Sequence, residues 1–139
     1  MLIKKTKFKD LYLIKKNKFK DNRGFFYRDY CKKEMKNLNF KIKQTNISFN
    51  HKKFTLRGFH HQVKPNQEKK IITCISGAIY NVSIDLRKKS KTYLKIFKIK
   101  LSEKNFQSIL VPKGFANAYL TLEDNTKIFY YMSEFYKPS

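Results

Sequence analysis

Alternation of apolar and polar residues with a period of two constrains the fold of this chain more than any other feature. It occurs in FKIKQTNISF at 40–49 and in YLKIFKIKL at 93–101, and it is typical of strands with one buried face. Further runs rich in β-branched and aromatic residues occupy 71–76, 78–85, 107–111, 115–121 and 127–132. Short turn-like breaks separate these runs. We therefore expect an all-β chain of about ten strands, a β-sandwich or a jelly-roll barrel with a pocket between its sheets.

A helical pattern is found in only one place, DYCKKEMKNLNF at 29–40, and we expect one short helix there. The chain has 139 residues, which suits a single domain with one core. It contains no internal repeat and no linker-like stretch. We expect one domain over residues 1–139.

The net charge of +22 comes mostly from lysine, since only four of the 32 cations are arginines. A basic surface attracts polyanions, but the chain has no zinc-finger, helix-turn-helix or aromatic RNA-binding motif, and we expect no nucleic-acid partner. The arginines are more informative, because a planar guanidinium grips phosphate in a way that lysine cannot copy. Arg23, Arg28, Arg57 and Arg87 lie in turn-like or strand positions. They indicate a small phosphorylated ligand.

Several classes of protein and site are excluded by what the sequence lacks. No apolar run approaches the length of about 20 residues that a membrane span needs, and lysines interrupt the N-terminus where a signal peptide would be apolar. Cys31 and Cys74 are too few for a disulfide scaffold or a zinc cage. The close histidines are adjacent rather than spaced His-x-His, and none follows residue 61. We expect a soluble cytoplasmic protein with no metal, no cofactor and no membrane partner.

Two adjacent histidines, His60 and His61 in TLRGFHHQ, raise a question of orientation. In a regular strand they point to opposite faces, so that only one enters a pocket. We expect His60 inside and His61 outside. Arg57 and His60 are three residues apart, so a regular strand would point them to opposite faces. Gly58 between them is a natural place for a bulge that turns one of them inward.

The motifs DNRGFFYRDY, KQTNISF, TLRGFHHQ and IDLRKKSKTY, and the stretch from ILVPKGFANAY onward, occur in an order that resembles the dTDP-4-dehydrorhamnose 3,5-epimerase family. The resemblance runs from about residue 18 to the last residue. It implies a cupin-type jelly roll, usually dimeric, that acts on a nucleotide-linked 4-keto-6-deoxy sugar. We therefore expect a homodimeric epimerase. Members of the family normally continue beyond the point where this chain stops.

The chemistry of such a reaction is clear from the substrate. A 4-keto group acidifies the hydrogens on both neighbouring ring carbons, so inversion needs a base on one face, a group that holds the enolate, and an acid on the other face. An imidazole titrates near pH 6.5 and suits the base. The resemblance makes His60 the base, Lys70 the group that steadies the oxyanion, and Tyr130 the acid. Lys70 is preferred to Lys69 because its spacing from both His60 and Gly77 fits the family without a gap.

The resemblance also assigns residues to substrate binding. It implies that two arginines grip the diphosphate and that Phe26 lies near the nucleotide base, with polar side chains in the pocket wall. The full set is Arg23, Phe26, Gln44, Asn46, Arg57, Asn81, Asn117 and Tyr136.

Two of these positions depart from the family pattern. Asn117 stands where members read His in Phe-Ala-His-Gly, and Asn81 stands where they carry an aspartate. In the family, the carboxylate partner of the catalytic histidine lies in the C-terminal region; here Glu68 is a candidate for that role. Asparagine in GFANAY also resembles a branch that acts on GDP-linked 4-keto heptoses. The resemblance therefore implies a dTDP- or a GDP-linked substrate.

Two other functions remain open from the sequence. A sugar-nucleotide 3,4-ketoisomerase has a similar length and barrel, although its usual motif is Arg-Gly-x-His-Ala-His. A paralogue without catalysis, which only binds a nucleotide sugar or a polyanion, is compatible with the altered residues 81 and 117. Product analysis distinguishes the first alternative, since a ketoisomerase moves the keto group. Binding without turnover identifies the second.

Overall fold

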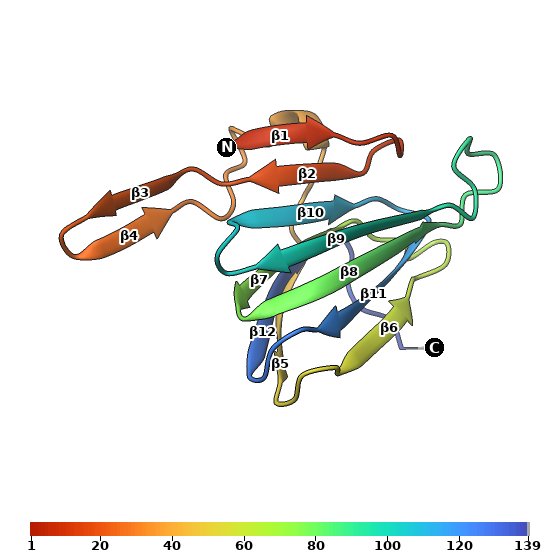
Figure 1. Ribbon diagram of the computed structural model, residues 1–139. Helices are drawn as coiled ribbons and strands as arrows, with labels where there is room; N and C mark the ends of the chain where they lie inside the picture. The colour runs from red at the N-terminus through yellow and green to blue at the C-terminus, as the bar shows by residue number, and fades with distance from the viewer. Residues whose placement is uncertain (139) are drawn as a thin grey trace.

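The computed structural model describes residues 1–138, which form twelve strands and one short 3₁₀ helix (Figure 1). The strands are β1 (Leu2–Lys5), β2 (Tyr12–Lys15), β3 (Lys18–Asp21), β4 (Gly24–Tyr27), β5 (Gln44–Asn50), β6 (Leu56–His60), β7 (Lys70–Ser76), β8 (Ala78–Asp85), β9 (Ile96–Ser102), β10 (Gln107–Val111), β11 (Phe115–Thr121) and β12 (Thr126–Met132). The 3₁₀ helix, η1, covers Lys36–Leu38.

The strands form two antiparallel sheets and a separate hairpin. The larger sheet has the order β1-β2-β10-β7-β12-β5, the smaller has the order β6-β11-β8-β9, and β3 pairs only with β4. Neighbours in these sheets are seldom consecutive in the chain, as in a jelly roll. The prediction of an all-β jelly roll is confirmed. The strands expected from the sequence correspond to β5 and β7 to β12, whereas β1 to β4 were not anticipated.

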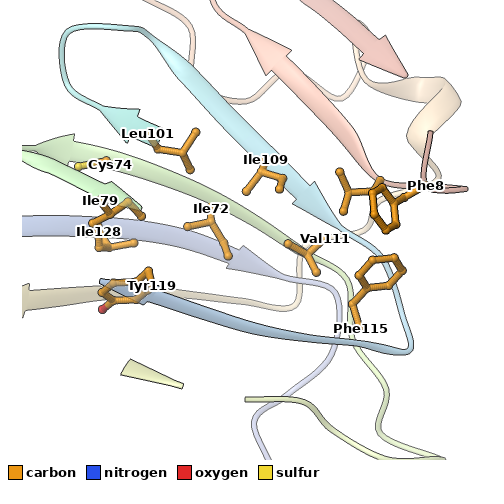
Figure 2. Packing of buried hydrophobic residues seen from close by; sticks show 11 residues of the cluster. Phe8, Ile72, Cys74, Ile79, Leu101, Ile109, Val111, Phe115, Tyr119 and Ile128 are labelled. Carbon is orange, nitrogen blue, oxygen red and sulfur yellow. The ribbon is translucent and has the colours of Figure 1, made fainter. Parts of the chain in front are cut away.

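The main hydrophobic core lies between the two sheets (Figure 2). The larger sheet contributes Ile72 and Ile128, and the smaller sheet contributes Ile79 and Tyr119, each from the inward-facing positions of its strand. Phe8, from the loop between β1 and β2, packs edge-on against two aromatic rings and closes one end of this core. Ile72, Tyr119 and Ile128 of this core also line the cavity described below.

A second cluster covers the outer face of the larger sheet. The helix expected within 29–40 is present here only as the three-residue 3₁₀ helix η1. Within 29–40 only η1 is helical, and the four residues before it, 32–35, form a turn. Met35, Leu38 and Phe40 are all buried against this sheet, and their uneven spacing does not fit one face of a regular helix. Asn39 adopts a left-handed conformation with φ of 45°, which ends the helical turn and directs Phe40 back to the sheet.

The hairpin β3–β4 projects from the body as an arm (Figure 1). A buried ion pair ties its base to the larger sheet, since Lys16 precedes β3 and its ammonium contacts Asp29, which follows β4. Asp29 also accepts a hydrogen bond from the Tyr131 hydroxyl at 2.9 Å. Burial lowers the pKa of Lys16, and the charge of Asp29 opposes that shift. The arm therefore has a fixed root and an exposed tip.

Within residues 1–138 no helix is long and apolar enough to cross a membrane.

Candidate active site

A cavity of about 580 Å³ opens between the two sheets. Its walls come from β5, β7 and β12 of the larger sheet and from β6 and β11 of the smaller one, together with the segments after β6, before β7 and after β12. The lining residues are Gln44, Asn46, Ser48, Arg57, Phe59, His60, His61, Gln62, Glu68, Lys70, Ile72, Asn117, Tyr119, Ile128, Tyr130, Met132, Tyr136 and Lys137.

Strand β5 supplies a polar wall by simple alternation. Gln44, Asn46 and Ser48 face the cavity, while Thr45 and Ile47 point to solvent. The Gln44 amide donates a hydrogen bond to Asn46 Oδ1 at 2.9 Å. The structure thus places Gln44 and Asn46 in the wall where the resemblance located them.

Strand β6 presents two cavity residues of opposite parity because it contains a bulge. Arg57 and His60 are three residues apart, but their partners on β11 are only two residues apart, so the register shifts between them. Gly58 has φ of +124°, and a Cβ atom there would lie 2.6 Å from the Cα atom of Ala118. Only glycine fits this position. The expected bulge is confirmed, and it brings both Arg57 and His60 to the cavity.

The expectation that His61 lies outside the pocket is wrong, since His61 lines the cavity together with His60. Strand β6 ends at His60, so the alternation of a regular strand does not extend to the next residue. In the described part of the chain, neither imidazole makes a hydrogen bond to another residue. Both rings are free to meet a ligand.

Lys70 and its neighbour Lys69 point to opposite sides of β7. Lys70 lines the cavity, and its ammonium lies 2.8 Å from Glu68 Oε1. The Lys69 ammonium instead donates to the backbone carbonyl groups of Leu38 and Asn39, both at 3.0 Å. Glu68, a candidate partner for the histidine, therefore pairs with Lys70.

Strand β12 delivers Tyr130 to the cavity between Ile128 and Met132. Burial raises the pKa of the Tyr130 phenol, and Tyr119 adds to the shift while the Arg57 charge opposes it. A phenol with a raised pKa stays protonated at neutral pH and can donate a proton.

The guanidinium of Arg57 is held from one side. Its Nε donates to Asn50 Oδ1 at 2.7 Å, and the amide of Asn50, which is buried, donates to the Thr126 carbonyl at 3.2 Å. Within residues 1–138 the two terminal nitrogens of Arg57 make no hydrogen bond. A guanidinium oriented in this way offers two parallel donors to an anion.

The C-terminal segment covers part of the cavity. The backbone N–H of Tyr136 donates to Gln44 Oε1 at 3.0 Å, and that of Lys137 donates to Gln62 Oε1 at 2.7 Å. Both Tyr136 and Lys137 therefore line the rim.

Three residues assigned to substrate binding lie outside the cavity of their own chain. Arg23 and Phe26 are on the β3–β4 arm, which pairs with no other strand of the described residues. The Arg23 side chain is 86% exposed and bonds Asp21 at 2.8 Å. Asn81 is fully buried on β8, so it cannot touch a ligand directly.

Asn81 belongs to a small polar network beneath the cavity floor. Its amide nitrogen lies 3.4 Å from Ser83 Oγ, and the Ser83 hydroxyl donates to Asn117 Oδ1 at 2.9 Å. If the Asn117 amide turns about its last bond, its nitrogen can donate to Asn81 Oδ1 at 3.1 Å. Asn117 lines the cavity and is the cross-strand partner of His60. Asn81 thus supports Asn117 from behind.

Sequence reasoning missed several lining residues that strand alternation could have found. Each lies two residues along a strand from a residue that was predicted to line the pocket; they are Ser48, Ile72, Tyr119, Ile128 and Met132. Gln62 and Lys137 lie in irregular segments, where period-two alternation gives no signal. As for metals, residues 1–138 contain no group of three or more His, Cys, Asp or Glu side chains placed to hold an ion.

Comparison with known proteins identifies the family. The sequence pattern of the dTDP-4-dehydrorhamnose 3,5-epimerases matches residues 5–139. The chain belongs to the dTDP-4-dehydrorhamnose 3,5-epimerase family. The member from Salmonella typhimurium is 32% identical over 142 aligned positions, which cover 100% of this chain and 77% of that protein. The member from Escherichia coli is 31% identical, with 99% of this chain and 76% of the relative covered.

Solved structures of this epimerase family share the fold. The dTDP-4-dehydrorhamnose 3,5-epimerase of Bacillus anthracis, crystallised with TDP and PPi, superposes with a TM-score of 0.94 at 38% identity and covers 98% of this chain and 79% of its own. The dTDP-6-deoxy-D-glucose-3,5-epimerase of Legionella pneumophila was solved in complex with dTDP-4-keto-L-rhamnose. It gives a TM-score of 0.92 at 28% identity, and the match covers 99% of this chain and 73% of that chain. The cupin-type jelly roll expected from the sequence is thereby confirmed.

Proposed function

We propose that the protein is an isomerase that epimerises a dTDP-linked 4-keto-6-deoxy sugar at C3, C5 or both. The observation that carries this proposal is the meeting of His60, Lys70 and Tyr130 in one cavity. His60 comes from β6 of the smaller sheet and Tyr130 from β12 of the larger sheet. A base and an acid on facing sheets can act on opposite faces of a sugar ring bound between them.

In the proposed reaction His60 takes the proton from the carbon beside the keto group. The electron pair of the broken C–H bond forms the enolate, whose negative oxygen meets the Lys70 ammonium. The Tyr130 hydroxyl then gives its proton to the same carbon from the opposite face, and the enolate returns to the ketone with inverted configuration. Tyr130 recovers a proton, and His60 loses one, by exchange with solvent.

Arg57 would hold the diphosphate, because its terminal nitrogens have no partner among residues 1–138 and its orientation is set by Asn50. Gln44, Asn46 and Asn117 would bind hydroxyl or carbonyl groups of the sugar, and Tyr136 would lie against the nucleotide at the rim. We favour dTDP over GDP as the nucleotide, since the relatives are named for dTDP sugars.

The test is product analysis by NMR with dTDP- and GDP-linked 4-keto-6-deoxy sugars. We expect the dTDP substrate to give an epimer that retains its keto group at C4. A product with the keto group at C3 would identify a ketoisomerase. Saturable binding of both sugars without turnover would identify a paralogue that has lost catalysis.

We also propose that the functional unit is a homodimer in which the arm of one copy reaches the cavity of the other. This would bring Arg23 to the diphosphate and Phe26 to the nucleotide base. Phe19 and Phe26 are cross-strand partners on the arm, and both are 62% exposed. An exposed aromatic pair on a projecting hairpin is typical of a surface that packs against another molecule.

Subunit complementation tests this arrangement. His60→Ala and Arg23→Ala should each inactivate the homodimer. If Arg23 acts on the partner's cavity, co-expression of the two variants should restore roughly a quarter of wild-type activity, because half of the dimers are mixed and one of their two sites is intact. No restoration would show that Arg23 serves its own chain or neither.

A further inference from the structure

Glu68 places a negative charge in a cavity whose other charged residues are basic. Arg57, Lys70 and Lys137 make the cavity basic, as a ligand with a diphosphate requires. Among the lining residues of the described chain, Glu68 is the one carboxylate. A negative charge in this place repels the proposed substrate, so it should weaken binding unless it serves another purpose.

The Glu68 side chain is buried and tightly paired. It is 5% exposed, its partner Lys70 is 15% exposed, and 2.8 Å separate Glu68 Oε1 from the Lys70 ammonium. The exposed pair Arg23–Asp21 is held at the same distance, but with side chains 86% and 51% exposed. Solvent screens an exposed pair strongly and a buried pair only weakly. The Lys70 ammonium is therefore held in position by a charge that water screens only weakly.

The local backbone explains why these two side chains meet. Glu68 lies two residues before Lys70, which begins β7, and residues two apart in an extended chain share a face. Lys69 between them turns to the outer side of the sheet, where two backbone carbonyl groups hold its ammonium. The pair Glu68–Lys70 is thus built into the inner face at the start of β7.

We propose that Glu68 is a positioning residue for catalysis: its carboxylate holds the Lys70 ammonium where the enolate oxygen forms. This inference rests on the proposed epimerase function. Glu68 acts through Lys70 and not on the substrate, so its removal should slow the chemistry without weakening the binding of the nucleotide. Because the carboxylate repels the diphosphate, binding should stay equal or become tighter.

The experiment compares wild type, Glu68→Gln, Lys70→Met and the double variant. Two quantities are measured: the rate at which solvent deuterium enters a dTDP-linked 4-keto-6-deoxy hexose at saturating concentration, and the dissociation constant of dTDP alone. We expect Glu68→Gln to slow exchange by about 10- to 100-fold while dTDP binds at least as tightly as to wild type. The double variant should be no slower than Lys70→Met.

Glu134→Gln is the matched control. It removes one carboxylate from an ion pair of similar length, 2.6 Å to Lys43, and neither of these residues lines the cavity. Both measured quantities should stay within about twofold of wild type. The comparison with Glu134→Gln separates the effect of losing any one negative charge from the effect of losing the charge beside Lys70.

Three results would overturn the inference. Exchange in Glu68→Gln at the wild-type rate would show that Lys70 needs no partner. Weaker dTDP binding in Glu68→Gln would indicate a merely structural role. A double variant slower than Lys70→Met would show that Glu68 acts independently of Lys70. In all three cases, deuterium exchange by the wild type would still support the proposed epimerase function. Absence of exchange in the wild type would overturn both the proposed function and the role of Glu68.

Discussion

Strands β12 and β6 face each other across the cavity, but they deliver their side chains by different means. Strand β12 is regular from Ile128 to Met132, so Tyr130 faces the cavity and Tyr131 the outer side of the sheet. Strand β6 is bulged, and its side chains at 57, 59 and 60 all reach the cavity. A regular strand allows the facing residues to be inferred from parity, whereas a bulged strand concentrates functional groups that parity would separate.

The largest expected effect comes from removing the bulge. In Gly58→Ala the new Cβ would lie 2.6 Å from Ala118 Cα and Cβ, at a φ of +124°. Gly24→Ala is the control, because Gly24 has a similar φ of +138° with no atom within 4 Å of the new Cβ. Both variants incur backbone strain, and only Gly58→Ala adds a clash. Denaturant unfolding should show Gly58→Ala less stable than Gly24→Ala by about 1–3 kcal/mol.

The same substitution should also disturb the site, since Arg57 and His60 both depend on the bulge. Epimerisation by Gly58→Ala should fall more steeply than its folded fraction. Equal stability of the two glycine variants, or wild-type activity in Gly58→Ala, would contradict the role assigned to the bulge.

The adjacent tyrosines Tyr130 and Tyr131 test whether the regular strand β12 separates its side chains by face. Tyr130→Phe should reduce formation of the epimer by about 100-fold and still allow deuterium to enter the substrate, since His60 can remove and return a proton on its own face. Its stability should change little, because the Tyr130 hydroxyl makes no hydrogen bond within residues 1–138.

Tyr131→Phe should behave in the opposite way. It removes the hydrogen bond to Asp29 and should cost about 1–2 kcal/mol of stability, with activity retained. Activity assays and thermal unfolding of both variants check the pair. Similar losses of activity in the two variants would show that β12 does not separate them by face.

The smallest expected effect is the pH dependence of the stability difference between wild type and Tyr131→Phe. Burial raises the pKa of Tyr131 above its ordinary value of 10.0, and the charge of Asp29 adds to the shift. The folded state therefore favours the neutral phenol, and this contribution is complete below pH about 10 and lost as the pH rises through the raised pKa. The stability difference between wild type and Tyr131→Phe should be constant from pH 7 to 9 and shrink above pH about 10. A difference that grows with pH would contradict this assignment.

Much of the fold followed from the sequence because β5 and β7 to β12 carry clear period-two patterns or β-branched runs. Strands β1 to β4 were missed because each has only four residues, too few for alternation to be distinct among so many lysines. The hairpin signal was nevertheless present in KFKDNRGFFY, where Phe19 and the aromatic run 25–27 flank a turn with glycine. The helix expected within 29–40 is limited to η1, because contacts with the sheet determine the rest of that segment.

A similar share of the cavity residues could be predicted from the sequence. Parity and resemblance located Gln44, Asn46 and Tyr130, and Gly58 indicated the bulge. His61 was misplaced because the end of β6 is set by the chain beyond it, which no local pattern reveals. The placing of Arg23 and Phe26 on a separate arm depends on long-range topology, and the pairing of Glu68 with Lys70 depends on a boundary of β7.

The most direct test of the account is solvent-deuterium exchange at C3 and C5 of a dTDP-linked 4-keto-6-deoxy sugar, followed by NMR with wild type, His60→Ala and His61→Ala. Both imidazoles line the cavity, but only His60 lies within the bulged strand opposite Tyr130. We predict that His60→Ala slows exchange by about 10³-fold, while His61→Ala remains at least about 100 times faster than His60→Ala. Exchange that survives in His60→Ala and vanishes in His61→Ala would contradict the assignment of His60 as the base.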